Sequence, residues 1–453
     1  MNIVLIGLGK VGKHIADLLS NEGHKIIVVD IDKDAVEEIS TNFDVLGVTG
    51  NAVSVSVLNE AKVNEADLLI AVTDTDEINM LTCLFAQKLN KNIKTIARIR
   101  NPIYSMQAKY LRSELGITYT INPEVVAARE IVRLLKYPDV VQVESFSKGR
   151  VELVSFNVEQ NEKLVNKSIE EISKQIGNQT LFVAIERDEE VIIPNGQTII
   201  KEKDVVSVVF RTSDSHEFFS KINIDTRGAR NVMVIGASMI SYHLARLLEK
   251  SKIGLTIIEK NKSRCEELSK LLADANIIYG DATDKNLLTE EGIKDVDAFV
   301  SLTNMDEENV MLSLYAKTIC DGQVITKIDH VNYDTLLSSM DLYPIVSPKE
   351  VIANEIVAFI RGLENAQGNN VNTLYRILNG KAEVLSFAIK KDSPIINKPL
   401  SVIKRIDNTI ICSIIRDGNA LTPGGDDVIK LNDIVLVATS HLGLKSIEDI
   451  FKE

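Results

Sequence analysis

The stretch MNIVLIGLGKVGKHIADLLSNEGHKIIVVDIDKD, residues 1–34, decides the fold of this chain. An apolar strand at 3–6 leads into the glycine pattern Gly7-Leu8-Gly9-Lys10-Val11-Gly12, which opens a helix with apolar residues at helical spacing. A second apolar strand at 26–29 ends in Asp30. Strand, glycine loop, helix and acidic residue in this order predict the first βαβ unit of a nucleotide-binding, Rossmann-like fold.

Each part of this loop has an expected role toward a nucleotide. Gly7 permits the tight turn, Gly9 lets a pyrophosphate approach the backbone, and Gly12 lets helix and strand pack closely. The phosphates would meet free amides and the positive end of the helix dipole. Asp30 can accept both hydroxyls of an adenosine ribose, which disfavours NADP but does not separate NAD(H) from ATP or ADP. The alternative is a glycine loop kept only for packing.

Further candidates follow the other strands of the same unit. Asn51 comes after the third strand, Thr73 and Asp74 end the fourth, and Arg98 lies in the strand TIARI. Ligands of such sheets bind at the carboxyl ends of the strands, so these residues are expected to line one crevice. Arg98 could instead pair with a carboxylate, and Lys10 could reach a terminal phosphate or lie in solvent.

The opening pattern recurs about half a chain later, as RNVMVIGASMISYHLARLLEKSKIGLTIIEKNKS at 230–263. Gly236 matches Gly7 and Glu259 matches Asp30, which makes both candidates for a second nucleotide site. The later glycines are missing, and the Cβ of Ser238 would crowd a pyrophosphate. The second crevice is therefore either a ligand site or a degenerate copy kept for architecture. The segment T-x-x-D-E-x-N, at 73–79 and 303–309, also repeats.

A second kind of segment alternates with these halves. Apolar runs of period two at 205–210 and 434–438 follow acidic turns and predict strands of small α+β modules. The stretches 211–230 and 364–373 are expected to be linkers. The predicted fold class is α/β, with two Rossmann-like doubly wound parallel sheets, each followed by a small α+β module. The expected domains are 1–140, 141–226, 227–363 and 372–453.

Composition limits the classes of partner that the chain is expected to bind. The 453 residues carry a formal net charge of −13, which argues against nucleic acid and against direct binding to an anionic membrane. No apolar run reaches the roughly 18–20 residues of a membrane span, and the start of the chain has no signal-peptide pattern. Four scattered cysteines are expected to be buried thiols in a reducing cytoplasm.

Three smaller features have structural explanations. The acidic run at 74–77 is expected to cap the following helix rather than to bind a metal. His14 and its counterpart His243 are expected to be packed or at an interface. Asn122-Pro123 and Ser347-Pro348 each predict a helix start with a capping side chain.

Taken together, these features resemble the regulatory subunit of Trk-type potassium-uptake systems, a family of two tandem RCK (regulator of potassium conductance) units. The resemblance covers essentially the whole chain and rests on the domain order, on GLGKVG with Asp30 and on the repeated T-x-x-D-E-x-N. It implies binding of NAD(H), and often ATP or ADP, through residues matching Gly7–Gly12, Asp30, Asn51, Thr73, Asp74 and Arg98.

The resemblance further implies a peripheral, non-enzymatic protein at the cytoplasmic face of the cell membrane. There a homo-oligomeric ring, dimer or tetramer would gate a membrane-embedded potassium channel or transporter. The helices after Pro123 and Pro348 and the exposed module faces would make the oligomer contacts. The second glycine loop departs from the family pattern.

Two other functions stay open. An NAD-dependent oxidoreductase would need an acid/base group and a substrate pocket, for which the duplicated modules offer no candidate. A cytosolic small-molecule sensor would bind a second ligand, such as a cyclic dinucleotide, in the modules. Loops at 193–196 and 422–425 mark places for it, but hairpin turns explain these loops equally well.

Overall fold

The fold was taken from a computed structural model. It describes residues 1–21, 23–136, 140–146, 149–158, 161–177, 180–188, 190–222, 228–249, 251, 253–329, 340, 342, 344–366, 371–378, 381–389, 393, 395–444 and 446–451. These residues form two compact units. Unit 1 contains residues 1–135 and 229–357, and unit 2 contains residues 136–228 and 358–453.

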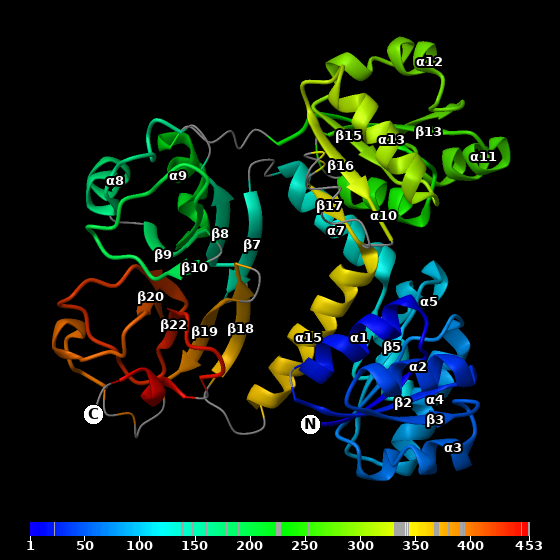
Figure 1. Cartoon of the computed structure of the whole chain (residues 1–453), viewed down its shortest axis with the longest axis horizontal. Helices are drawn as coiled ribbons and strands as arrows, with labels where there is room; N and C mark the ends of the chain where they lie inside the picture. Colours follow the sequence, from blue (N-terminus) through cyan, green and yellow to red (C-terminus); the bar gives the residue numbers. More distant parts are fainter. Residues whose placement is uncertain are drawn as a thin grey trace. The chain divides into compact units, whose positions relative to one another are not determined.

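The first half of unit 1 is a parallel six-stranded sheet in the order β3-β2-β1-β4-β5-β6. This is the doubly wound nucleotide-binding order, with the change of direction between β1 and β4. In Figure 1 the helices of this half surround its strands. The elements are β1 Asn2–Ile6, α1 Lys10–Asn21, β2 Lys25–Asp30, α2 Lys33–Asn42, β3 Val45–Thr49, α3 Val55–Glu60, β4 Leu68–Ala71, α4 Asp76–Leu89, β5 Lys94–Arg98, α5 Pro102–Met106, α6 Ala108–Leu115, β6 Tyr119–Ile121 and α7 Pro123–Lys136.

The second half of unit 1 repeats this sheet as β14-β13-β12-β15-β16-β17. The strands pair in matching registers, so that Ile6 faces Val29 in the first copy and Ile235 faces Ile258 in the second. The elements are β12 Asn231–Ile235, α10 Met239–Leu248, β13 Gly254–Glu259, α11 Lys262–Leu271, β14 Ala275–Tyr279, α12 Lys285–Glu290, β15 Ala298–Ser301, α13 Asp306–Lys317, β16 Gln323–Lys327, β17 Ile345–Val346 and α15 Pro348–Ala366.

Helix α7 packs on the other half of unit 1. Its residues Ala127, Ile131 and Leu135 are buried in a cluster whose members outside α7 all lie in residues 229–346, mostly in the second parallel sheet and its helices. In return, the hydroxyl of Tyr119 donates to Glu355 of α15. The apolar face of α7, expected to contact another subunit, is thus covered within the same chain.

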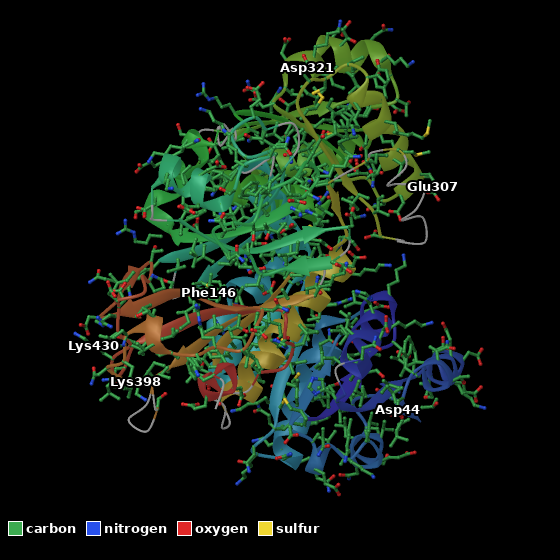
Figure 2. The ribbon with its side chains drawn as sticks, turned by 60° about the vertical axis from the view of Figure 1, so that its left-hand side comes forward. Asp44, Phe146, Glu307, Asp321, Lys398 and Lys430 are labelled. Atoms are coloured by element: carbon green, nitrogen blue, oxygen red, sulfur yellow. The ribbon has the colours of Figure 1, made fainter. Side chains whose placement is uncertain are left out.

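Unit 2 holds two five-stranded antiparallel sheets, β10-β9-β11-β8-β7 and β18-β19-β22-β20-β21. Apolar side chains from both sheets share one core, which includes Val384 and Leu436. Phe146 of β7 belongs to the same core and is labelled in Figure 2. The first sheet and its helices are β7 Val140–Phe146, β8 Val151–Asn157, α8 Ile169–Ile176, β9 Thr180–Arg187, β10 Glu190–Ile192, β11 Val205–Arg211 and α9 Ser215–Lys221. The second sheet is β18 Val371–Ile377, β19 Ala382–Ala388, β20 Thr409–Arg416, β21 Asn419–Leu421 and β22 Ile434–Thr439.

The predicted fold class is confirmed, and the expected domain boundaries stay predictions. The expected linker at 211–230 is wrong in its first half, because α9 buries Phe218 and Phe219 against the core of the first module. The linker at 364–373 lies partly in α15 and β18, and its middle, 367–370, is outside the described residues.

Two capping predictions had different outcomes. Asn122 accepts a hydrogen bond from the amide of Val125 at 3.0 Å, so it caps α7 as expected. The hydroxyl of Ser347 is buried and has no hydrogen-bond partner among the described residues, so its capping bond to α15 is not made. All four cysteines are buried and free, and burial raises the pKa of the Cys83 thiol to about 12.

Candidate functional site

The first glycine loop combines two crowded positions with an open one. Gly7 has φ +95°, and a Cβ there would lie 2.9 Å from the backbone nitrogen of Thr73. A Cβ on Gly12 would lie 1.9 Å from the carbonyl oxygen of Gly7. A Cβ on Gly9 would meet nothing within 4 Å. The fold therefore requires Gly7 and Gly12, whereas Gly9 leaves open space beside the backbone.

That open space lies at the start of α1. Gly9 precedes the helix and has no side chain with which to cap the first amides, which an α-helix leaves without partners inside itself. These amides and the helix dipole favour an anionic group. The geometry fits a phosphate at this point.

Asp30 lies beside the loop, and two backbone amides orient its carboxylate. One of its carboxylate oxygens accepts the amide of Leu8 at 2.5 Å, and the other accepts the amide of Asp32 at 2.9 Å. A carboxylate has about four acceptor positions, so each oxygen can still take one hydroxyl. Asp30 is only partly buried and can therefore meet a ribose diol.

A buried side-chain amide, that of Asn79, fixes the ends of β4 and β5 beside the loop. Asn79, on α4, is fully buried and accepts the amide and the hydroxyl of Thr73 at 2.8 and 2.7 Å. Its own amide group donates to the carbonyl of Arg98 at 2.9 Å. Asn79 thus joins the ends of β4 and β5, which explains why the motif ends in asparagine.

Arg98 is a buried cation with weak pairing. Its side chain is 9% exposed, and its Nη2 lies 3.4 Å from the carboxylate of Asp74, which is fully exposed. Its Nε is buried and has no hydrogen-bond partner among the described residues. Burial, and next the charge of Arg100, lower the pKa of Arg98, which Asp74 only partly offsets. An anionic ligand would supply the missing partner.

The acidic run after Thr73 has a role that differs from the expected helix cap. Asp76 is nearly buried and accepts the amides of Arg100 and Asn101 at 2.9 and 2.7 Å, so it closes the loop after β5. Thr75, at the capping position of α4, makes no side-chain capping bond. Asp76 and Glu77 do lie in the first turn, where they complement the helix dipole. In the described ranges no group of three or more His, Cys, Asp or Glu side chains could hold a metal ion.

The second crevice keeps the acidic residue in the same geometry. Glu259 accepts the amides of Ala237 and Asn261, both at 2.7 Å. Gly236 has φ +98°, and a Cβ there would lie 3.0 Å from the carbonyl oxygen of Leu302. The turn and the ribose acid of the first copy are thus both reproduced.

The loop between them is closed by serines. The hydroxyl of Ser238 accepts the amide of Ser241 at 3.2 Å and so caps α10. The hydroxyl of Ser241 donates to the carbonyl of Gly236 at 2.5 Å. Side chains of the chain itself therefore occupy the place that is open beside Gly9.

The second crevice nevertheless contains a cavity of about 390 Å³. Two cations line it, each with its own acidic partner: Lys260 lies 3.1 Å from Glu308, and Arg264 lies 2.6 Å from Glu267. Arg264 also donates through Nε to the carbonyl of Ala237 at 2.9 Å. Sequence reasoning missed both cations, although they replace Ile31 and Ala35 of the first copy.

The same division into parts is found in known proteins. Residues 3–123 and 232–348 match the TrkA-N domain, and residues 153–223 and 384–452 match the TrkA-C domain. The chain belongs to the TrkA family. The Trk system potassium uptake protein TrkA homolog 1 of Methanosarcina mazei is 32% identical over the whole of both chains. The Trk system potassium uptake protein TrkA of Halomonas elongata is 31% identical over all of this chain and 99% of its own.

Solved structures share the fold at lower identity. The GsuK channel bound to NAD is 17% identical, with a TM-score of 0.64 over 97% of this chain and 76% of its own. The GsuK RCK domain has a TM-score of 0.63, at 17% identity, over 96% of this chain and 92% of its own. Each Rossmann-like half with its module thus shares the fold of an RCK domain. None of the described helices of this TrkA family member has the length and apolar character of a membrane span.

The sequence-predicted site residues fall into two groups. Gly7, Leu8 and Asp30 lie after β1 and at the end of β2, and Thr73, Asp74 and Arg98 lie at the ends of β4 and β5; Gly7 and Thr73 bring the two groups together. Asn51 lies at the same strand edge, exposed, and its side chain accepts the amide of Val53. Lys10 is exposed and Val11 partly buried at the start of α1. Asn79 was missed as a positioning residue, although its recurrence at 309 was a usable signal.

Proposed function

We propose that this TrkA family member is a nucleotide-sensing regulatory subunit of a membrane potassium-uptake system. The observation that carries the proposal is the open position at Gly9 between an uncapped helix and the prepared carboxylate of Asp30. The pyrophosphate of NAD(H), or the phosphates of ATP or ADP, would lie against that helix, and the ribose would meet Asp30. Support for the physiological role comes from the relatives, which are named as potassium uptake proteins.

The proposed mechanism is a shift between two arrangements. The protein acts without catalysis, at the cytoplasmic face of the membrane, as a homo-oligomer on a potassium channel or transporter. A nucleotide in the crevice would contact residues at the ends of β1 and β2 and residues at the ends of β4 and β5. At the second place Arg98 could bind an anionic group of the ligand, because its Nε has no hydrogen-bond partner among the described residues. A ligand shifts such an equilibrium only if it binds one arrangement more tightly than the other.

Calorimetric titration of the full chain with NADH, NAD, NADPH, ATP and ADP tests the binding step. We expect saturable binding of NAD(H) or of adenine nucleotides, reduced at least tenfold in Asp30→Ala. Asp44→Ala is the matched control, because Asp44 is exposed just before β3 (Figure 2), at the sheet edge opposite the crevice. Affinity within about twofold of wild type in Asp30→Ala would place the ligand elsewhere.

Potassium uptake in cells tests the regulatory step separately. Cells that carry the Asp30→Ala chain should take up potassium without response to the nucleotide. If this variant loses nucleotide binding while uptake remains fully regulated, the crevice binds a ligand but does not gate transport.

A further inference from the structure

The second crevice offers a defined volume for a small ligand. Its cavity of about 390 Å³ is near the lower end of the roughly 300–1,000 Å³ usual for ligand sites. It lies at the carboxyl ends of β12, β13 and β15, with Gly236, Glu259 and Thr303 in its lining. This is the edge at which doubly wound sheets bind their ligands.

The features that would bind a ribose are present at this edge. Both oxygens of Glu259 are oriented by backbone amides at 2.7 Å, as those of Asp30 are by the amides of Leu8 and Asp32. Each oxygen keeps acceptor capacity for a hydroxyl group. A ribose with free 2′- and 3′-hydroxyls therefore meets the same arrangement of acceptors in both crevices.

The features that would bind phosphate groups are missing from this edge. The hydroxyl of Ser238 takes the amide of Ser241, which a phosphate would need at the helix start. The lining carries three carboxylates, Glu259, Asp281 and Glu308, against the two cations Lys260 and Arg264. Both cations are already ion-paired, so a phosphate would compete with carboxylates for them.

We infer that the second crevice binds an uncharged ribonucleoside, of which adenosine is the simplest probe, and excludes dinucleotides and nucleoside diphosphates. Glu259 recognises the ribose, Arg264 offers a guanidinium on which a base can stack, and Ser238 excludes the phosphates. This goes beyond the proposed function, because it assigns a second ligand class to a second site. It does not depend on what the first crevice binds.

The test uses the full chain with the first crevice disabled by Asp30→Ala. Calorimetry with adenosine, AMP, ADP and NAD should show one adenosine per chain and affinity falling in that order. Adding Glu259→Gln should weaken adenosine at least tenfold, whereas adding Glu266→Gln, an exposed change on α11 outside the cavity lining, should not. Adding Ser238→Gly should strengthen ADP and NAD at least tenfold by uncapping α10.

The Ser238→Gly variant keeps the inference testable even if Glu259→Gln fails to fold. The inference is overturned if adenosine does not bind, if ADP or NAD binds as tightly as adenosine, or if Ser238→Gly leaves their affinities unchanged. If the first crevice of the wild-type chain binds neither NAD(H) nor ATP or ADP, the proposed function is overturned instead, and this result stays intact.

Discussion

The two glycine loops of this chain begin alike and end differently. In both, a glycine with positive φ turns the chain beneath a neighbouring strand, and a carboxylate accepts two backbone amides. The first loop then leaves its helix start open at Gly9, whereas Ser238 caps the second helix. The fold thus accepts either glycine or serine at this position. The residue that stands there can therefore determine which ligand the loop binds.

Gly12→Ala should have the largest effect, because its Cβ would lie 1.9 Å from the carbonyl oxygen of Gly7, a backbone atom that cannot move alone. We expect a loss of about 1–3 kcal/mol or more in unfolding free energy. Ser241→Ala, at the matching position, removes the hydroxyl that bonds the carbonyl of Gly236 and the hydroxyl of Ser238, and should cost about 1–2 kcal/mol. Equal unfolding midpoints in denaturant for the two variants would show that the loops are equally tight.

Asn79→Ala and Asn309→Ala should resemble each other in stability but differ in function. Each removes an amide that bonds the threonine six residues earlier and the carbonyl at the end of the next strand. Unpaired buried groups should cost about 1–3 kcal/mol in either variant. Only Asn79→Ala should weaken nucleotide binding in the first crevice, which titration of both variants would check. A similar loss of affinity in Asn309→Ala would mean that the halves are coupled.

Gly9→Ser converts the first loop toward the second. The Cβ of the new side chain would meet nothing within 4 Å, and its hydroxyl can cap α1, so stability should change by only a few tenths of a kcal/mol. Nucleotide affinity should fall at least tenfold, or about 1.4 kcal/mol, because the phosphate loses its place. Gly9→Ala serves as a control that adds the Cβ without the capping hydroxyl. Unchanged affinity in Gly9→Ser would show that the open position is not the phosphate site.

The smallest effect on stability is expected from His14 and His243, which occupy equivalent positions in the two halves. Burial lowers the pKa of both below the ordinary 6.5, offset in part by Glu350 near His14 and by Glu124 near His243. The unfolded chain therefore binds more protons between the lowered pKa and about 6.5, so stability is full above this window and falls as pH decreases through it. The drop in Tm between about pH 7.5 and 5.5 should be smaller in His14→Gln and His243→Gln. An unchanged drop would assign the pH dependence to other groups.

Local sequence signals predicted most of the fold because they are short-range. The parallel sheets follow from buried apolar strands, and the helix starts at Pro123 and Pro348 follow from the fixed φ of proline. The error at 211–230 arose because polar residues there outnumber the two phenylalanines that anchor α9. A single buried pair outweighs average polarity, and averaging over the segment conceals it.

The residues of the candidate site that belong to a local motif were predictable from the sequence. The residues that reach the site through long-range packing were not. Gly7, Gly9, Gly12 and Asp30 follow from spacing alone. The bond from Asn79 to the carbonyl of Arg98, and the placement of Arg264 over the second loop, join different strands and helices. Such contacts depend on the three-dimensional arrangement of the elements, which local sequence patterns do not specify.

The packing of α7 has a consequence for how the chain is made. Among the described residues, the core cluster that covers Ala127, Ile131 and Leu135 is completed, outside α7 itself, by residues 229–346, which leave the ribosome later. Until then the nascent first half presents an uncovered apolar helix, and its gene segment expressed alone would present it permanently. The duplicated halves are therefore no longer separable modules. An ancestor that worked as two identical chains would have formed the same contact between subunits, and gene fusion would have turned assembly into folding.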